Sequence, residues 1–255
     1  TAEGFQMTAL KVENITKSFD GQTIIRHVSL TLKDGELVSL LGVSGGGKTT
    51  LFNIIAGLSQ PDEGKIFLDG HDITGKPGQI SYMLQKDLLL PYRTTLDNVA
   101  LPLLIKGMPK AKARLQASEY FAQFGLEGTQ KKYPSQLSGG MRQRAALLRT
   151  YLFSEKVALL DEPFSALDML TKSAVHDWYL QVMETIHLST LFVTHDIEEA
   201  ILLSDRIYLL TGTPGSVTKE IRIEEPRPRK REFSLSERFL DYKRQILMHL
   251  EKAQG

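Results

Sequence analysis

The first part of the chain alternates apolar and polar residues in the manner of strands. Within residues 10–32, Val28, Leu30 and Leu32 alternate with polar neighbours. The pair Asp20-Gly21 divides this segment, and Asp-Gly between two such runs is a strong turn signal. We therefore expect an antiparallel sheet near the N-terminus.

A strand, a loop and a helix are expected next. Residues 37–41 form a near-continuous apolar run, which is typical of a strand covered on both faces. A glycine-rich stretch follows it directly. Leu51, Ile54 and Ile55 then recur at helical spacing, and Gly57 stands where a helix would end.

Helical spacing dominates residues 94–151. Met141, Ala145, Leu148 and Leu152 lie three or four positions apart along one stripe, which predicts an inserted helical subdomain. Apolar runs predict further buried strands at 80–84, 157–160 and 191–193, with helices at 170–186 and 236–250 and a linker at 225–232. The fold class is thus α/β: a mainly parallel sheet, an N-terminal antiparallel β subdomain and an inserted α-helical subdomain. We expect one domain over 7–255, with a core at 7–93 and 153–225, a helical subdomain at 94–152, and a C-terminal linker and helix at 226–255.

Composition narrows the function classes. Thirty-one Lys and Arg against thirty Asp and Glu leave a net charge of +1, so no overall bias toward nucleic acid or anionic lipid is present. The lack of cysteine excludes disulfides, thiolate metal sites and thiol catalysis. Apolar stretches such as 99–105 are far shorter than the roughly 18 to 20 residues that cross a bilayer. Residues 1–6 lack the parts of a signal peptide, and we interpret them as a remnant of an expression vector.

The glycine-rich segment 42–49 carries the first candidate chemistry. It fits the pattern of a glycine, any four residues, then Gly-Lys-Thr, and it lies between a predicted strand and a predicted helix. Its amides and the helix dipole would bind phosphates, Lys48 would contact the β and γ phosphates, and the Thr49 hydroxyl would ligate Mg²⁺. The alternative is a plain glycine-rich turn. The predicted ATP contacts are Gly42, Ser44, Gly45, Gly46, Gly47, Lys48, Thr49 and Thr50.

Two acids and a histidine follow predicted strands. Asp161 and Glu162 end the run 157–160, at the sheet edge where ligands normally bind. Asp161 suits the Mg²⁺ shell, and Glu162 could polarise the water that attacks the γ-phosphate. His195 follows the run 191–193 and could donate a hydrogen bond to that phosphate. The alternatives are a solvated acidic turn and an ordinary surface histidine.

The segment 137–144, Leu-Ser-Gly-Gly-Met-Arg-Gln-Arg, resembles the signature sequence of ATP-binding cassette proteins. Ser138, Gly139 and Gly140 precede a predicted helix, so they would form a second phosphate-binding end; a simple helix cap is the alternative for Ser138. The resemblance extends over most of residues 10–212. It implies a P-loop ATPase fold in which ATP and Mg²⁺ are bound between two head-to-tail copies, as a homodimer or a dimer with a similar cassette.

Further roles are implied by this resemblance. Gln85 matches the glutamine that contacts Mg²⁺ and water and links the nucleotide site to the helical subdomain. Asp168 matches a loop that crosses between paired subunits. Phe19 matches the aromatic residue that stacks on adenine, although Tyr is more common there, and core packing is the alternative. Gly46 and Thr49 replace more usual residues but keep the backbone and hydroxyl chemistry.

The more specific resemblance is to importer subunits of the nitrate, sulfonate and taurine type. It depends on residues 89–92 with 96–99, on Met141-Arg142, and on Thr213-Pro214-Gly215 ahead of Pro226-Arg227. It implies integral membrane permease subunits as partners, a solute-binding protein as an indirect partner, no nucleic acid, and a peripheral location on the cytoplasmic face of the inner membrane. We expect residues 88–92 to form a groove for a helix of the membrane subunit, an ordinary core loop being the alternative.

Two other functions remain open from the sequence. A soluble cassette ATPase acting on DNA or the ribosome is the first, although only 51 residues separate Gln85 from Leu137 and no sustained heptads occur there. The second is a nucleotide-binding module without hydrolysis, which would require loss of Glu162 or His195.

Overall fold

The N-terminal hairpin begins a four-stranded sheet. In the computed structural model, which describes residues 7–42, 45–154, 156–229 and 231–253, β1 (Thr8–Phe19) and β2 (Gln22–Lys33) pair antiparallel. Asp20 and Gly21 form the turn with φ of 50° and 79°, which Asp and Gly tolerate better than most residues. β4 (Glu63–Leu68) and β5 (His71–Asp72) complete the sheet in the order β2-β1-β4-β5.

A six-stranded sheet forms the centre of the molecule, in the order β10-β9-β3-β8-β7-β6. Neighbours from β9 to β6 run parallel, and β10 is antiparallel to β9. Every residue of β3, β7, β8 and β9 is buried, as expected for strands covered on both faces. The segments that follow β3, β7 and β8 therefore meet at one edge. The strands are β3 (Leu37–Gly42), β6 (Ser81–Met83), β7 (Val157–Asp161), β8 (Ser189–Thr194), β9 (Arg206–Thr211) and β10 (Ser216–Arg222).

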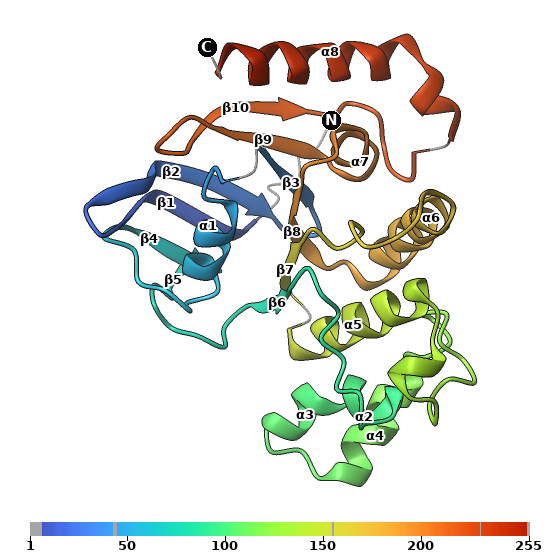
Figure 1. The fold of residues 1–255 in the computed structure, drawn as a ribbon. Helices are drawn as coiled ribbons and strands as arrows, with labels where there is room; N and C mark the ends of the chain where they lie inside the picture. Colours follow the sequence, from blue (N-terminus) through green and yellow to red (C-terminus); the bar gives the residue numbers. More distant parts are fainter. Residues whose placement is uncertain (1–6, 43–44, 155, 230, 254–255) are drawn as a thin grey trace.

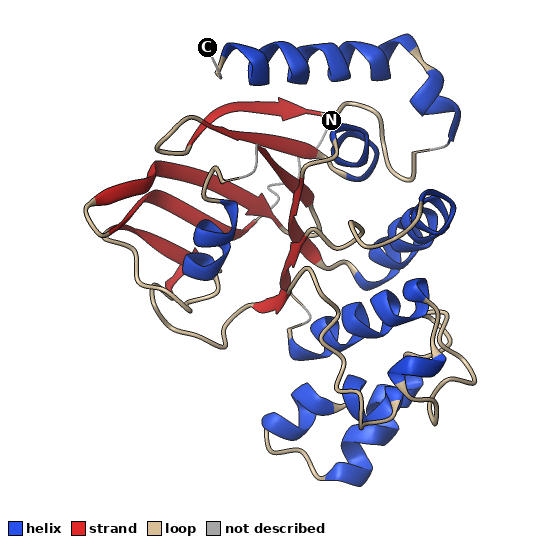
Figure 2. Ribbon diagram, in the orientation of Figure 1, coloured by secondary structure: helices blue, strands red, loops and turns tan. Residues whose placement is uncertain are grey.

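The helices lie in three places (Figures 1 and 2). α1 packs against β1, β2 and β7, α2 to α5 gather at one end of the molecule, and α8 lies along the β9–β10 side together with α7. Among the described residues, no helix is long and apolar enough to cross a membrane. The helices are α1 (Lys48–Ile55), α2 (Thr95–Val99), α3 (Leu101–Ile105), α4 (Lys110–Glu119), α5 (Gly139–Phe153), α6 (Met169–Ile186), α7 (Ile197–Leu203) and α8 (Glu237–Lys252), with short 3₁₀ turns at Pro134–Gln136 and Arg231–Leu235.

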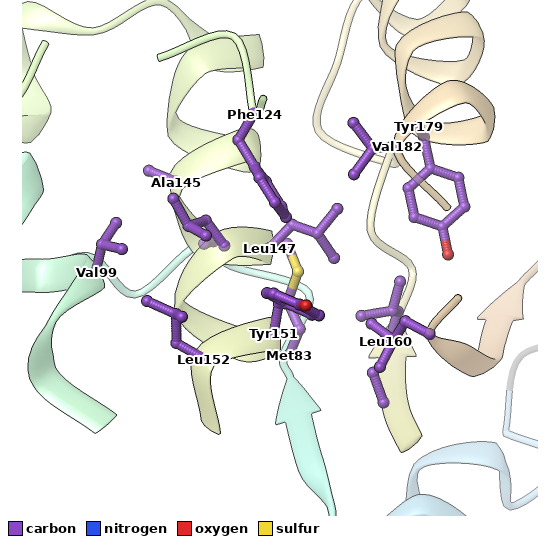
Figure 3. Packing of buried hydrophobic residues seen from close by; sticks show 14 of the residues in the cluster. Met83, Val99, Phe124, Ala145, Leu147, Tyr151, Leu152, Leu160, Tyr179 and Val182 are labelled. Atoms are coloured by element: carbon purple, nitrogen blue, oxygen red, sulfur yellow. The ribbon is translucent and has the colours of Figure 1, made fainter. Parts of the chain in front are cut away.

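Helix α5 joins the helical end to the central sheet. Figure 3 shows it between α2, which contributes Val99, and the side formed by Leu160 of β7 and Tyr179 of α6. Ala145 and Leu148 of α5 are fully buried. This apolar packing holds the start of α5 in a defined position relative to β7 and α6, since buried side chains of this kind each contribute about 1.5–3 kcal/mol.

The α/β class with an antiparallel and a mainly parallel sheet is confirmed, and several details differ from expectation. The strand expected at 80–84 is limited to β6, because it lies at the sheet edge and Leu84 is exposed. Met141 is only partly buried at the start of the predicted stripe. Residues 1–6, interpreted as a vector remnant, lie outside the described residues. Elements that the sequence analysis did not predict are β4, β5, β9, β10 and α7, whereas α2, α3 and α4 lie within the region predicted to be helical.

Candidate nucleotide-binding and hydrolysis site

The glycine-rich loop leads from β3 directly into α1. Gly47 is the N-cap with φ of 89°, a conformation that only glycine adopts readily. Lys48 is 8% exposed, and its Nζ donates a hydrogen bond to the carbonyl oxygen of Gly42 at 2.8 Å. The side chain thus folds back over the loop. Ser44, predicted here as an ATP contact, lies outside the described residues.

Two distant segments press against this loop. A Cβ on Gly215 would overlap the carbonyl oxygen of Gly46, and a Cβ on Gly47 would overlap the side chain of Ile25. Gly215 N also donates to Ile24 O at 2.8 Å, and Arg26 N donates to Gly215 O at 2.9 Å. The β9–β10 turn and β2 therefore hold the loop from outside. Sequence analysis noticed Gly215 in a motif but assigned it no part in the site.

A cleft of about 300 Å³ opens at the start of α1. Thr49 and Thr50 lie there with the free amides and positive dipole end of the helix, and α1 has no acidic residue in its first turn. Such a helix start favours an anion. The residues that line the cleft are Ile24, Gly45, Gly47, Lys48, Thr49, Thr50, Asp161, Glu162 and Val193.

Asp161 is the buried acid of this cleft. It is 9% exposed, and Tyr82 donates its hydroxyl to Oδ2 at 3.4 Å. Burial and then the charge of Glu162 raise the pKa of Asp161, against the opposing effects of Tyr82 and Lys48. Burial lowers the pKa of Lys48, although Glu162 and Asp161 oppose that shift. Two carboxylates thus lie close enough to one ammonium group to affect its pKa.

This arrangement fits Mg²⁺. The candidate ligands Thr49, Gln85 and Asp161 offer hydroxyl, amide and carboxylate oxygens, which are the donors that Mg²⁺ prefers. A divalent cation would also offset the like charges that raise the pKa of Asp161. Few protein ligands are needed, because Mg²⁺ in nucleotide sites keeps waters and phosphate oxygens in its shell.

Glu162 joins this cleft to a second one of about 710 Å³. Its Oε2 accepts a hydrogen bond from the Gln85 amide at 3.0 Å, and its Oε1 lies 3.3 Å from Nδ1 of His195. Glu162 has φ of 45°, an uncommon backbone conformation that breaks the regular alternation of β7 directly after Asp161. Gln85 also donates to Ser165 Oγ at 3.3 Å. The structure therefore brings Gln85, Glu162 and His195 together.

Ser138 caps helix α5. Its side-chain oxygen accepts a hydrogen bond from Met141 N at 3.2 Å, and the residue is exposed. A Cβ on Gly139 would contact Leu167, and one on Gly140 would press on Thr171 of α6. The start of α5 therefore lies close to the segment that leads into α6, while the Ser138 hydroxyl remains at the surface.

Asp168 and Phe19 are also at the surface. Asp168 is the N-cap of α6, and hydrogen bonds from Thr171 lower its pKa. Phe19 is 47% exposed, with the Lys17 ammonium 5.2 Å from its ring centroid. Neither these residues nor Ser138, Gly139 and Gly140 line the cleft around Lys48, so one chain does not bring all of the predicted contacts together.

Sequence analysis missed Tyr82 and Ser165 as members of the site. Tyr82 lies on β6, and its role depends on the pairing of β6 with β7, which places its hydroxyl beside Asp161. Ser165 follows Glu162 by three residues and donates to Glu162 O at 3.0 Å. Its place in the segment Ser165-Ala166-Leu167-Asp168, which contains the predicted site residue Asp168, could have indicated that it belongs to the site.

A phosphate loop between a buried strand and a helix, with an Asp-Glu pair on a neighbouring strand, defines a P-loop nucleoside triphosphatase. A family model described as ABC transporter matches residues 25–165. The chain belongs to the ABC transporter family. It is an ATP-binding subunit that hydrolyses ATP and uses Mg²⁺.

Similar proteins agree with this assignment. The chain is 45% identical over 224 residues to the formylaminopyrimidine import ATP-binding protein ThiZ of Halalkalibacterium halodurans, which covers 88% of each chain. It is 36% identical to the nitrate import ATP-binding protein NrtC of Synechococcus elongatus over 95% of this chain and 38% of that one. The dimeric post-hydrolysis structure of the ATP-binding cassette MJ0796 with ADP and Pi matches with a TM-score of 0.70 and 31% identity, over 85% of this chain and all of that one.

Proposed function

We propose that this chain hydrolyses ATP as a head-to-tail dimer to drive import of a small solute through separate membrane subunits. The observation that carries the proposal is the position of Glu162, in contact with both Gln85 and His195 and on the wall of the cleft that contains Lys48 and Asp161. A general base, a phosphate contact and a residue from the loop after β6 thus converge at one point.

The proposed chemistry is in-line attack of water on the γ-phosphate. Glu162 orients and polarises the water, since a carboxylate within hydrogen-bond reach can accept its proton. Lys48 and the amides at the start of α1 stabilise charge on the transferred group, and His195 donates a hydrogen bond to it. Bound Mg²⁺, held through Thr49, Gln85 and Asp161, supplies further positive charge next to the β and γ phosphates.

The second half of each site is proposed to come from a second copy. Ser138, Gly139 and Gly140 present a helix start without an acidic residue in its first turn, which suits a phosphate. Asp168 would contact the opposing copy, and Phe19 would stack on adenine. The exposed positions of Ser138, Asp168 and Phe19 support this proposal, and dimeric structures of related cassettes support the pairing itself.

A groove of about 430 Å³ is proposed to receive an apolar helix of the membrane subunit. Leu88 is 52% exposed on its wall, and its carbonyl oxygen accepts a hydrogen bond from Arg149 of α5 at 2.9 Å. The groove thus connects the segment after Gln85 with the helical end, for which we retain the proposed subdomain boundaries 94–152. The core would be 7–93 and 153–225, with a linker and helix at 226–255. Apolar groove residues include Leu58, Leu88, Leu101, Ile105 and Phe153.

The proposed cargo is a small anionic or heterocyclic solute. Relatives named for formylaminopyrimidine import and for nitrate import support this class and the peripheral location at the cytoplasmic face of the membrane. The alternative of an ATPase acting on DNA or the ribosome is not favoured, because relatives named as import proteins match along nearly the whole chain.

The variant Glu162→Gln tests the proposal. It keeps a group that can hydrogen-bond Gln85 but loses the base, so we expect retained ATP binding, hydrolysis reduced by about 100-fold or more, and an ATP-dependent dimer. Light scattering with and without ATP measures the dimer, and an exposed-surface variant, Glu251→Gln, serves as the control. A monomer at saturating ATP, or hydrolysis at the wild-type rate, would overturn the proposal.

A further inference from the structure

Four charged or titratable side chains meet between α6 and the start of α7. Lys172 Nζ lies 2.7 Å from Asp196 Oδ2 and 3.1 Å from Glu199 Oε1. Nε2 of His176, one helical turn after Lys172, lies 3.1 Å from the same oxygen of Glu199. None of the four was singled out by the sequence analysis as a site residue, and none lines the clefts around Lys48 and Glu162.

Glu199 is the buried member of this cluster, whereas the side chain of Asp196 is 36% exposed. Glu199 is 3% exposed, and the side chains of Lys172 and His176 are 22% and 12% exposed. Burial would raise the pKa of Glu199, but hydrogen bonds from His176 and Thr194 and the charges of His176 and Lys172 lower it overall. The carboxylate therefore stays ionised between two α6 side chains, a position in which losing a partner is costly.

Asp196 links the cluster to the backbone next to His195. One carboxylate oxygen, Oδ1, caps α7 by accepting from Glu198 N at 3.0 Å and Glu199 N at 3.2 Å. The other oxygen, Oδ2, accepts a hydrogen bond from the Lys172 ammonium at 2.7 Å. Asp196 N in turn donates to Thr194 Oγ1 at 3.0 Å. Lys172 thus holds the residue that directly follows His195.

The opposite end of the cluster reaches the segment between Glu162 and α6. Lys172 N donates to the carbonyl oxygen of Asp168 at 2.8 Å, so Lys172 is in the first turn after that residue. The Phe164 ring packs edge-on against His176, with 4.7 Å between ring centroids. α6 therefore carries, within two turns, the Asp168 cap and both side chains that hold α7.

We propose that Lys172 is a positioning residue that fixes His195 relative to Asp168, so that the γ-phosphate contact in one copy and the inter-subunit segment move as one unit. The inference rests on the proposed function, since it assigns the roles of His195 and Asp168. Lys172 lines neither of the two clefts of the site. It acts through Asp196, and a displacement of about 1 Å at a reacting group is enough to cost about 100-fold in rate.

The ion pairs of Lys172 contribute more to the position of α7 relative to α6 than to the stability of the fold. Burying two charges costs desolvation energy that their attraction only partly recovers, so such pairs add little net stability. Their geometric specificity is the better-supported use. An ammonium with two carboxylate partners on α7 fixes both the rotation of that helix and its distance from α6.

Four variants separate positioning from folding. Lys172→Met removes the ammonium but keeps most of the apolar stem, and Lys172→Arg restores a cation that can bridge both carboxylates. Asp196→Asn keeps an oxygen for the α7 cap but removes the charge. Lys243→Met is the matched control, since Lys243 of α8 pairs with Glu198 on the exposed face of the same helix at 2.6 Å.

We expect Lys172→Met to lower kcat by about 10- to 100-fold with little change in KM for ATP. Asp196→Asn should do the same, and the double variant should be no worse than either single one, because both remove one interaction. Lys172→Arg should recover most of kcat, and Lys243→Met should match the wild type. Melting temperatures measured in parallel identify any variant that fails to fold.

Unchanged kcat in Lys172→Met, or fully additive losses in the double variant, would overturn the inference. Wild-type hydrolysis and the ATP-dependent dimer of Glu162→Gln are measured in the same series. If those two behave as proposed while Lys172→Met is inert, only the positioning role fails. If they do not, the proposed function itself fails.

Discussion

Helices α1 and α5 both have a small N-cap residue and no acid in the first turn, yet their surroundings differ. The start of α1 is enclosed. Gly47 has a left-handed backbone conformation, Lys48 is buried, and Gly215 of the β9–β10 turn packs against the loop. The start of α5 is open, because the Ser138 hydroxyl caps its own helix at the surface. One anion site is therefore built within the chain, whereas the other is presented outward.

This contrast accounts for the two copies in the dimer that we propose. The enclosed start lies beside the acids of β7, so it has the groups for hydrolysis but leaves the outer face of a triphosphate uncovered. The open start has amides and a dipole, but its residues do not line the cleft that contains Lys48. Each of the four predictions below tests one side of this contrast.

The largest effect is expected from Lys48→Ala, which breaks the enclosed site. Among the described residues, Lys48 is the only cation that lines the cleft of about 300 Å³, so its loss should weaken ATP binding and reduce kcat/KM by about 100-fold or more. Calorimetric titration with ATP and steady-state hydrolysis measure the two effects. Lys65→Ala, on the exposed face of β4, is the control. Normal ATP affinity in Lys48→Ala would contradict the assignment.

A second large effect is expected from Ser138→Asp, which breaks the open site without removing its cap. Asp caps a helix as well as Ser does, so the melting temperature should stay near that of the wild type. The added charge would repel the phosphate of the opposing copy, and the ATP-dependent dimer should disappear. Ser138→Asn, a neutral cap, is the matched control. Dimers in both variants would argue against Ser138 as a phosphate contact.

A moderate effect is expected from Gly215→Ala, which would displace the phosphate loop without removing any of its side chains. Gly215 is not in the left-handed region, so alanine adds only a methyl group against the Gly46 carbonyl oxygen. Overpacking of this kind costs about 1–3 kcal/mol, and we expect KM for ATP to rise by about tenfold. Ser216→Ala on the same turn is the control. An unchanged KM would mean that the turn does not support the loop.

The smallest effect is expected in the pH dependence of stability, which should differ between the charged cap Asp196 of α7 and the neutral cap Ser138 of α5. Burial would raise the pKa of Asp196, the cap of α7, but Lys172 and the amides of Glu199 and Glu198 lower it overall. A lowered folded pKa gives stability that is complete above the ordinary value of 3.8 and is lost as pH falls further. The neutral cap Ser138 has no such dependence. In the wild type, the unfolding free energy should fall by at most about 1 kcal/mol below about pH 4 because Asp196 becomes protonated. Asp196→Asn should remove this fall, whereas Ser138→Asn should leave it unchanged. Thermal denaturation between pH 7 and pH 3 measures this.

Local patterns predicted the parts of the fold that depend on nearby residues. The Asp20-Gly21 turn joins β1 and β2, and the residues of the α5 stripe from Ala145 onward are buried. β4 was missed because Ile66 is its only fully buried residue, which leaves no clear alternation. α7 was missed because seven residues are too few to establish a helical period.

The site could be predicted only where its members are close in sequence or belong to a known motif. Lys48 lies in such a motif, and Asp161 and Glu162 end an apolar run. The contact of Gly215 with Gly46 joins residues that are far apart in the chain, and so does the pairing of Lys172 with Asp196. Such contacts result from strand order and helix packing, which one sequence does not encode as a local pattern.

Both oxygens of Glu162 are engaged by neighbouring side chains, one by Gln85 and one beside His195. A carboxylate held in this way has little freedom to accept a proton from water. Idle turnover would be restrained until bound triphosphate draws His195 away or a membrane subunit displaces the segment that carries Gln85. The acid that we propose as the general base would then also limit ATP hydrolysis between transport cycles.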